Sequence, residues 1–171
     1  MLKKCFILLG SNIQPRENIK RAIHEISNFY DVKKISKIYE TKPIVKTNVG
    51  NYYNAVIEIY SDFSPLDIKF KILRKIEEDM GRVRTEDKFK SRVIDLDLII
   101  YGEDIFEDDN FILPDPEIEK YIHIAKPLSD IAFDIIHPKL GISYGEIMSK
   151  LSSDTLLNGF LIEDLWLWCW I

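Results

Sequence analysis

The strongest strand signal in the chain is the run Val93-Ile94-Asp95-Leu96-Asp97-Leu98-Ile99-Ile100-Tyr101. Its β-branched and aliphatic residues predict a buried strand. Working back from this strand, the hydrophobic pattern predicts three earlier strands, at residues 5–9, 32–39 and 52–60, and a long loop at residues 40–51. On the third of these strands, Tyr53, Ala55, Ile57 and Ile59 alternate with Tyr52, Asn54, Val56, Glu58 and Tyr60, which predicts two distinct faces.

Two amphipathic helices are expected between these strands. The first begins near Pro15, and its apolar face consists of Ile19, Ala22, Ile23, Ile26 and Tyr30. The second begins at Ser64-Pro65-Leu66-Asp67 and ends at Gly81, with an apolar stripe of Leu66, Phe70, Leu73, Ile76 and Met80.

The predicted order β-α-β-β-α-β is that of a ferredoxin-like α+β sandwich, in which two helices pack on one face of a four-stranded sheet. Residues after Gly102 are then C-terminal additions to this core. Within them we expect a rigid loop at residues 113–116, a short strand or helix at 122–131, and a short helix at 143–151.

Length and composition are typical of one globular domain. The chain has 171 residues, of which 46% are hydrophobic and 30% are charged, which argues against disorder and against a membrane bundle. We expect a single domain over residues 1–164, followed by an apolar tail over residues 165–171 that is too short to span a bilayer.

Charge and cysteine content indicate which partners and which cellular compartment to expect. The net charge of -5 argues against a nucleic-acid-binding protein. The two cysteines, Cys5 and Cys169, form neither a disulfide framework nor a zinc motif. Residues 1–10 are interpreted as the first strand and not as a targeting segment. We therefore expect a cytoplasmic monomer that binds neither membranes nor nucleic acid.

Asp95 and Asp97 are the first candidate functional residues. On a strand they point to the same face, because the side-chain period is two. Two neighbouring carboxylates repel each other unless a divalent cation, which prefers oxygen ligands, neutralises them. The pattern therefore predicts a metal site, and the alternative is a solvated strand face that carries two aspartates.

The segment before this strand is strongly basic in an otherwise acidic chain. It contains Arg82, Arg84, Lys88, Lys90 and Arg92, against the acidic pair Glu86 and Asp87. Guanidinium groups opposite a carboxylate pair can bind a metal-associated polyphosphate, although a solvated charged loop has the same composition. If the strand extended back to Arg92, the Arg92 side chain would point to the face opposite to Asp95 and Asp97, so it must bend back to reach their site.

A third cluster has the composition of a site for a flat polar ring. Thr41-Lys42-Pro43-Ile44 lies in the predicted long loop, and Tyr52 shares a strand face with Asn54. A ring could stack on the tyrosine while the asparagine amide and the loop backbone bind its polar edge. The alternative is a half-exposed packing pair and a turn contact.

Together these residues resemble the 6-hydroxymethyl-7,8-dihydropterin pyrophosphokinase family of folate biosynthesis. The resemblance covers residues 6–138, and the combination of Gly81-Arg82-Val83-Arg84 with Arg92-Val93-Ile94-Asp95-Leu96-Asp97 is its most specific part. The supporting motifs are Leu9-Gly10-Ser11-Asn12, Tyr39 with Thr41 and Pro43, Tyr52 with Asn54, Ile76-Glu77, Leu113-Pro114, and Pro127-Leu128-Ser129-Asp130-Ile131-Ala132.

The resemblance implies an enzyme that transfers the diphosphate of ATP to the hydroxymethyl group of a reduced pterin alcohol and releases AMP. It implies two Mg²⁺ ions bound by Asp95 and Asp97, with Arg82 and Arg92 joining these aspartates as catalytic residues. It further implies ATP binding by Glu77, Arg82, Arg84, Lys88, Arg92 and Asp115, and pterin binding by Thr41, Pro43, Ile44, Tyr52, Asn54, Asp95 and His123.

This chain departs from the family pattern at four positions. Asp115 stands where the family commonly has the histidine of a Pro-His-Pro motif, and Tyr121 stands where an arginine is expected. His123 takes the place of a second stacking aromatic residue, and Phe89 that of a tryptophan in the basic loop. The expected metal ligands are unchanged, whereas a variant substrate becomes conceivable.

Two other classes of function fit the same residues. One is another metal-dependent enzyme with an Asp-x-Asp pair, such as a nucleotidyltransferase or glycosyltransferase. The other is a non-catalytic ferredoxin-like module that binds a small ligand or RNA, because the same fold serves many functions. The acidic composition and the lack of an aromatic-rich RNA-binding strand argue against RNA.

Overall fold

The computed structural model describes residues 1–41, 50–83, 91–109, 111–154 and 162–163. Among these residues, six strands form one antiparallel sheet and two short strands form a separate hairpin. The strands of the sheet are β1 (Lys3–Ser11), β2 (Val32–Ile35), β3 (Ile38–Thr41), β4 (Tyr52–Ser61), β5 (Asp95–Tyr101) and β8 (Ile162–Glu163). The hairpin consists of β6 (Phe106–Glu107) and β7 (Ile112–Leu113).

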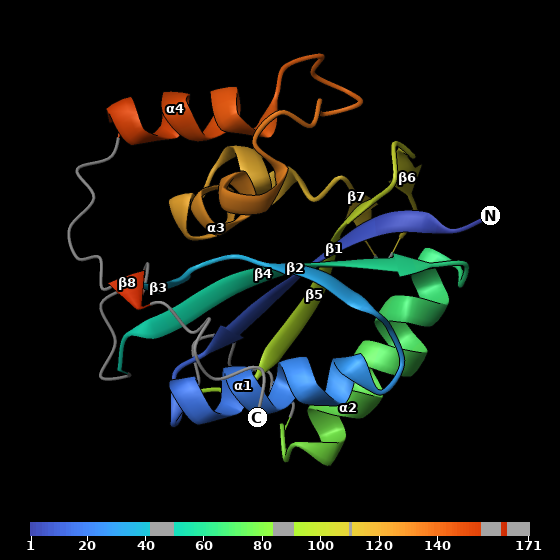
Figure 1. The fold of residues 1–171 in the computed structure, drawn as a ribbon, viewed down its shortest axis with the longest axis vertical. Helices are drawn as coiled ribbons and strands as arrows, with labels where there is room; N and C mark the ends of the chain where they lie inside the picture. The colour runs from blue at the N-terminus through green and yellow to red at the C-terminus, as the bar shows by residue number, and fades with distance from the viewer. Residues whose placement is uncertain (42–49, 84–90, 110, 155–161, 164–171) are drawn as a thin grey trace.

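The strand order in the sheet is β5-β1-β4-β3-β8, and β2 also pairs with β4. The long strands β1 and β4 therefore lie side by side in the middle (Figure 1). The pairing of β1 with β5 shifts by one residue: Phe6 is opposite Ile100, but Ile7 is opposite Leu98. Ile99 is the extra residue at this bulge, which changes the phase of β5 with respect to β1.

Helices cover both faces of the sheet. The helical segments are α1 (Pro15–Ser27), the π-helical η1 (Asp67–Leu73), α2 (Arg74–Asp79), the short 3₁₀ turn η2 (Pro116–Glu119), α3 (Ile122–Ala132) and α4 (Tyr144–Asp154). Figure 1 shows α1 and α2 below the sheet and α3 and α4 above it. The segment after Gly102, expected as an addition, thus supplies the helices of the second face, and its first uncertain element, residues 122–131, is a helix.

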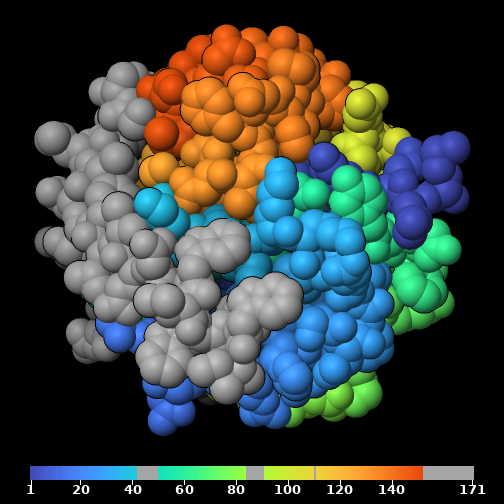
Figure 2. Space-filling view, in the orientation of Figure 1, coloured from blue at the N-terminus to red at the C-terminus, as the bar shows by residue number. Residues whose placement is uncertain are grey.

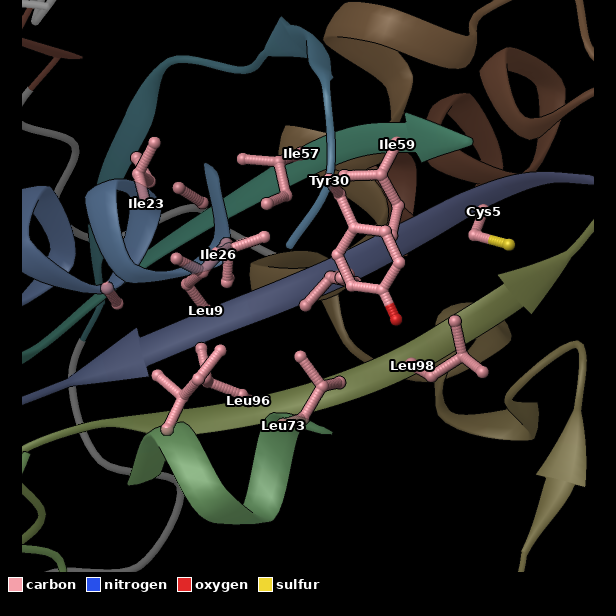
Figure 3. Packing of buried hydrophobic residues seen from close by; sticks show 14 of the residues in the cluster. Cys5, Leu9, Ile23, Ile26, Tyr30, Ile57, Ile59, Leu73, Leu96 and Leu98 are labelled. Atoms are coloured by element: carbon pink, nitrogen blue, oxygen red, sulfur yellow. The ribbon is translucent and has the colours of Figure 1, made fainter. Parts of the chain in front are cut away.

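The main core lies between the sheet and the helices α1, η1 and α2. Leu9 of β1, Ile57 of β4 and Leu96 of β5 are almost fully buried there, together with Ile26 of α1 and Leu73 of η1 (Figure 3). These strand residues alternate with those of the opposite face, as the period of two requires. Removing their apolar surface from water stabilises this layer.

A second core lies on the other face, under α3 and α4. It contains Phe6 of β1, Val56 of β4 and Ile100 of the edge strand β5, with Leu128 and Tyr144 from the helices above them. In Figure 2 the orange helices occupy one end of the molecular surface and the blue α1 the opposite end. The remaining part of this sheet face, toward the end of β1 at Ser11, is where the polar residues of interest lie.

The single strand predicted over residues 32–39 is wrong in one respect, because the structure has two strands there. β2 ends at Ile35 and β3 begins at Ile38, while both pair with β4. Ser36 separates them: its hydroxyl accepts a hydrogen bond from the Val56 N–H at 2.8 Å and donates one to the Lys37 carbonyl at 2.7 Å. β3 also extends to Thr41, so the predicted loop begins later than residue 40.

The helix predicted to begin near Ser64 is present, and its predicted stripe is buried at Leu73, Ile76 and Met80 but differs in the first part of the helix. Leu66 is exposed and Phe70 is partly exposed, whereas Ile68 is fully buried. The cause is the π-helical geometry of η1, which has more residues per turn than the α-helix that the prediction assumed. Ser64 caps the helix as expected, because its hydroxyl accepts the Asp67 N–H at 3.1 Å.

Candidate active site

Gly10 of β1 marks the centre of the polar part of the sheet face. It pairs with Asn54 of β4 on one side and with Asp95 of β5 on the other, so the three residues lie in one row across the sheet. A Cβ atom on Gly10 would lie 3.3 Å from Asn54 Oδ1 and 3.9 Å from Asp95 Cβ. Glycine therefore leaves room between a polar amide and a carboxylate on neighbouring strands.

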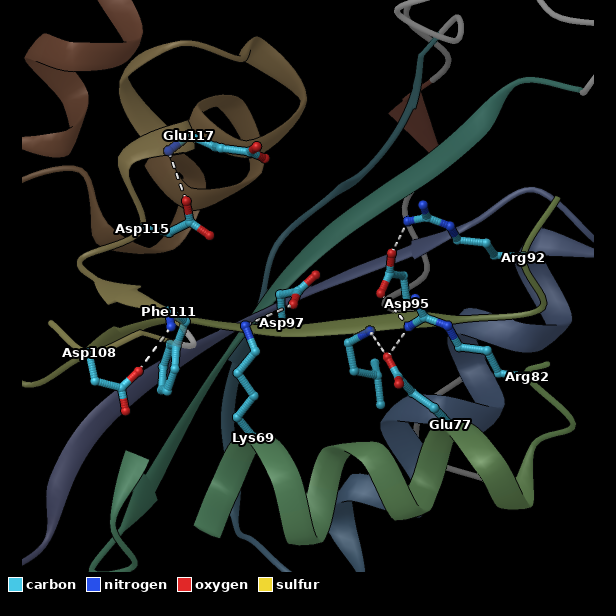
Figure 4. Close-up of polar contacts among 11 residues, drawn as sticks. Lys69, Glu77, Arg82, Arg92, Asp95, Asp97, Asp108, Phe111, Asp115 and Glu117 are labelled. Atoms are coloured by element: carbon cyan, nitrogen blue, oxygen red, sulfur yellow. Dashed lines mark hydrogen bonds and ion pairs between the residues drawn. The ribbon is translucent and has the colours of Figure 1, made fainter. Parts of the chain in front are cut away.

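Asp95 and Asp97 extend from β5 to the same side, as their spacing predicts (Figure 4). The guanidinium groups of Arg82 and Arg92 both form ion pairs with Asp95, each with a different carboxylate oxygen. Arg92 precedes β5, and its side chain bends back to Asp95, as the sequence analysis predicted. The structure therefore brings together the four residues expected to be catalytic.

Glu77 lies behind this cluster and is buried, with 1% of its surface exposed. Its carboxylate pairs with Arg82 and accepts the Leu96 N–H at 2.8 Å. Burial lowers the pKa of Arg82, but the carboxylates of Asp95 and Glu77 outweigh this effect and raise the pKa overall. Arg82 is thus held in its charged form between two acids, which fixes its position beside Asp95.

Asn12 is a positioning residue that the sequence motif contains but does not explain. Its side-chain oxygen accepts the Arg92 N–H at 2.7 Å, and its own N–H donates to the Arg92 carbonyl at 3.2 Å. The neighbouring hydroxyl of Ser11 donates to the Val93 carbonyl at 2.6 Å. The turn after β1 therefore holds the segment that carries Arg92. Spacing could not reveal this, because the partners are about 80 residues apart.

Asp97 differs electrostatically from Asp95. Asp97 is partly buried, with 38% of its side-chain surface exposed, and this burial together with the charge of Asp95 raises its pKa. Its ion-pair partner is Lys69 of η1, with Nζ 3.4 Å from Asp97 Oδ1. No sequence motif singled out Lys69, because a lysine on an amphipathic helix is normally a solvated residue.

The expected ring-binding residues lie on the β4 side of Gly10. The Asn54 amide nitrogen donates to the Thr41 hydroxyl at 2.9 Å, and Tyr52 pairs with Thr41 in the register of β3 and β4. Asn54 is almost fully buried, whereas Tyr52 is partly exposed. Thr41, Tyr52 and Asn54 thus form one cluster at the end of the sheet. Pro43 and Ile44 lie outside the described residues.

Asp115 lies between β7 and η2, and His123 lies in the first turn of α3. The Asp115 carboxylate accepts the Glu117 N–H at 2.8 Å and caps η2, while its own N–H donates to the Ile99 carbonyl at 2.9 Å. Burial raises the pKa of Asp115. His123 stacks on Tyr121 with ring centroids 5.5 Å apart, and burial lowers its pKa to about 4. His123 is therefore neutral at physiological pH.

The expected nucleotide ligands Arg84 and Lys88, and the departure at Phe89, lie outside the described residues. Within the described ranges, no group of three or more histidine, cysteine, aspartate or glutamate side chains is arranged to hold a metal ion. Asp95 and Asp97 are two oxygen donors, a number that suits Mg²⁺ when water and substrate phosphates complete its coordination.

Within the described parts of the chain, every helix falls short of the length and apolar character that crossing a bilayer requires.

Solved structures share this fold. The Plasmodium falciparum protein HPPK-DHPS, in its wild-type crystal structure with pteroate, matches with a TM-score of 0.73 at 13% identity, over 90% of this chain and 45% of that chain. Its A437G variant matches with a TM-score of 0.74.

Two sequence relatives align with most of this chain. The folic acid synthesis protein fol1 of Pneumocystis carinii is 36% identical over 148 residues, which is 85% of this chain but 20% of that protein. The 2-amino-4-hydroxy-6-hydroxymethyldihydropteridine pyrophosphokinase of Aquifex aeolicus is 32% identical over 134 residues, which is 78% of this chain and 82% of that protein. The family model described as 7,8-dihydro-6-hydroxymethylpterin-pyrophosphokinase matches residues 6–133. The resemblance drawn from the motifs is thereby confirmed: the chain belongs to the 7,8-dihydro-6-hydroxymethylpterin-pyrophosphokinase family.

Proposed function

We propose that this chain transfers the β,γ-diphosphate of ATP to the hydroxymethyl oxygen of 6-hydroxymethyl-7,8-dihydropterin and releases AMP. In this reaction the hydroxyl oxygen bonds to the β-phosphorus, the bond from that phosphorus to the α-phosphate oxygen breaks, and the hydroxyl proton is lost. One observation carries the proposal. Gly10 separates the Asn54 cluster from the Asp95 cluster by a single strand, so a small polar ring and a polyphosphate could meet above it.

The β4 side of Gly10 supplies the pterin half of the proposed site. Tyr52 would stack on the ring, while Asn54 and Thr41 would hydrogen-bond its polar edge. The Asn54–Thr41 hydrogen bond of 2.9 Å supports this assignment, because it holds the amide in one orientation before a ligand arrives. Pro43, Ile44, His123 and Asp95 complete the proposed set of pterin contacts.

The β5 side supplies the proposed metal and phosphate half. Asp95 and Asp97 would hold two Mg²⁺ ions, which when bound would lower the pKa of the attacking hydroxyl and neutralise the phosphates. Arg82 and Arg92 already lie against Asp95, so they are positioned to offset the charge that develops on the transferred and leaving oxygens. Glu77, Arg84, Lys88 and Asp115 complete the proposed nucleotide contacts, with Glu77 acting through Arg82.

We also infer that the core has the ferredoxin-like plan. If β2 and β3 are counted together as the second strand along the chain, then β1 is the first, β4 the third and β5 the fourth. Across the sheet these strands follow in the order fourth, first, third, second, with α1 and α2 on one face. This order supports a split βαβ arrangement with β2 and β3 together acting as the second strand. The pairing of β8 with β3 supports a single domain that extends to about residue 164, with residues 165–171 as a tail.

The acidic net charge of -5 supports a protein without nucleic-acid partners. We further propose that it acts as a monomer in the cytoplasm. Gel filtration with light scattering tests the first of these two expectations: a mass near 20.1 kDa agrees with it, and a multiple of that mass contradicts it.

The reaction itself is tested by its products. The full chain is incubated with ATP, Mg²⁺ and 6-hydroxymethyl-7,8-dihydropterin, and nucleotides and pterins are separated by chromatography. AMP and diphosphorylated pterin in equal amounts are expected. Release of inorganic diphosphate or a nucleoside diphosphate would indicate a different class of transferase. AMP formation with a related alcohol, but not with this pterin, would indicate a changed substrate.

A further inference from the structure

Lys69 is a cation at the candidate active site that no motif of the family resemblance includes. It extends from η1 toward β5, and its Nζ lies 3.4 Å from Asp97 Oδ1 and 4.6 Å from the centre of the Phe111 ring (Figure 4). The side chain keeps 23% of its surface exposed. Lys69 is thus neither a core residue nor a freely solvated one, and it faces the same space as the aspartate pair.

The charges around Asp97 explain why a cation is needed there. Asp95 is paired with two arginines, whereas Lys69 is the ion-pair partner recorded for Asp97 among the described residues. The charge of Lys69 also acts on Asp115. This chain has a carboxylate at position 115, where the family commonly has histidine, so the site carries one more negative charge on the side that Lys69 occupies.

The geometry favours a ligand-binding role over a structural ion pair. A separation of 3.4 Å is longer than a typical N–H···O hydrogen bond, and a partly exposed ion pair of this kind contributes little to folding. A divalent cation on Asp97 would repel the ammonium group, whereas phosphate oxygens would attract it. A lysine ammonium is a compact charge with three donors, which suits a phosphate that arrives with its metal.

We propose that Lys69 binds the polyphosphate of the nucleotide, that it pairs with Asp97 when no nucleotide is bound, and that it offsets the charge of Asp115. This inference rests on the proposed function, because it assumes that a nucleoside triphosphate occupies the Asp95 and Asp97 side of the site. It assigns to η1 a direct part in nucleotide binding.

The test is equilibrium binding of α,β-methylene-ATP with Mg²⁺, measured by calorimetry on the full chain. In this analogue the bond that would break cannot be cleaved. Lys69→Met should raise the dissociation constant about tenfold through loss of one charge-assisted phosphate contact, whereas Lys69→Arg should stay within about threefold of the wild type. Lys71→Met is the matched control, because Lys71 lies on the same helix, pairs with Asp67 and is exposed.

Binding of the metal alone separates the two roles of Lys69. Without nucleotide, Lys69→Met should bind Mn²⁺ as tightly as the wild type or more tightly, because a competing cation has been removed from Asp97. If Lys69 had only a structural role, Lys69→Met should weaken the binding of both Mn²⁺ and the nucleotide analogue and lower the melting temperature. In the Lys69→Met background, the change Asp115→Asn should recover part of the nucleotide affinity, because the carboxylate that Lys69 offsets is gone.

Wild-type nucleotide affinity in Lys69→Met, or a parallel loss of Mn²⁺ and nucleotide binding, would overturn the proposal. The outcome is independent of catalysis. A wild-type chain that binds the analogue but forms no AMP with the pterin would refute the proposed function and leave the role of Lys69 to be decided by the binding data.

Discussion

One face of the sheet is divided into two regions that use the same three strands differently. Under α3 and α4, Phe6, Val56 and Ile100 point into an apolar core. Farther along these strands, Gly10, Asn54 and Asp95 occupy the equivalent orientation in a polar region. The covered region should therefore determine stability, whereas the polar region should determine chemistry, and substitutions can test whether the two are separable.

The largest effect is expected at the aspartates of the polar region. Asp95→Asn and Asp97→Asn should each lower the rate of AMP formation about 1,000-fold, because each removes a proposed metal ligand while keeping the shape of the side chain. The rate is measured in the product assay at saturating Mg²⁺. Asp104→Asn is the control, since Asp104 forms a surface ion pair with Lys3. A loss below tenfold in both aspartate variants would contradict the proposed site.

The next effect is expected in the covered region. Phe6 is 1% exposed and packs under α3 and α4. Phe6→Ala should lower the free energy of unfolding by about 3 kcal/mol, since it opens a cavity, as measured by urea denaturation. Phe6→Leu should cost less. The rate of AMP formation per folded molecule should stay near that of the wild type, and a rate loss as large as that of Asp97→Asn would show that the two regions are coupled.

In the first turn of α3, His123 should make stability depend on pH. Its pKa is about 4 in the folded chain and 6.5 in an unfolded one. Between these values the unfolded chain binds the additional proton, so the free energy of unfolding falls as the pH falls from 6.5 toward 4. His123→Gln should reduce this fall in the free energy of unfolding by about 2 kcal/mol, as measured by denaturation at several pH values.

His24→Gln serves as the matched control for this experiment, because His24 lies exposed on α1. If both substitutions change the acid dependence equally, burial of His123 is not its cause.

The smallest effect separates stability from function at one residue. The raised pKa of Asp97 means that its charged form is disfavoured in the folded chain, so stability falls as the pH rises from 3.8 through the folded pKa. Asp97→Asn should therefore raise the free energy of unfolding at pH 7, by less than about 1 kcal/mol because solvent still reaches the side chain. The gain should vanish below pH 4 in the same denaturation series. A less stable variant would mean that the ion pair with Lys69 dominates.

Much of the fold could be predicted because the strands have clear periodicity. The alternation of residues 52–60 and the apolar run near residue 95 match the observed β4 and β5. The break at Ser36 could not be predicted, because it depends on hydrogen bonds to Val56. Nor could the burial of Ile68 in η1, since a π-helix leaves no distinct sequence pattern.

The site was predictable where local spacing determines geometry and not where distant segments meet. Asp95 and Asp97 are two residues apart, so on a strand they were expected to point to the same face, and in the structure they do. By contrast, Asn12 holds Arg92 across about 80 residues, and Lys69 reaches Asp97 from another element. Such contacts depend on the packing of η1 and the turn after β1 against β5.

The register shift at Phe6 and Ile7 has a consequence for how this strand tolerates insertions and deletions. Because the extra residue, Ile99, lies between the two parts of β5, a deletion there would realign the apolar end with β1 and leave Asp95 and Asp97 facing as before. The same deletion N-terminal to Asp97 would turn one carboxylate to the opposite side. Length variation should thus be far less damaging at the bulge than at Leu96, three residues upstream.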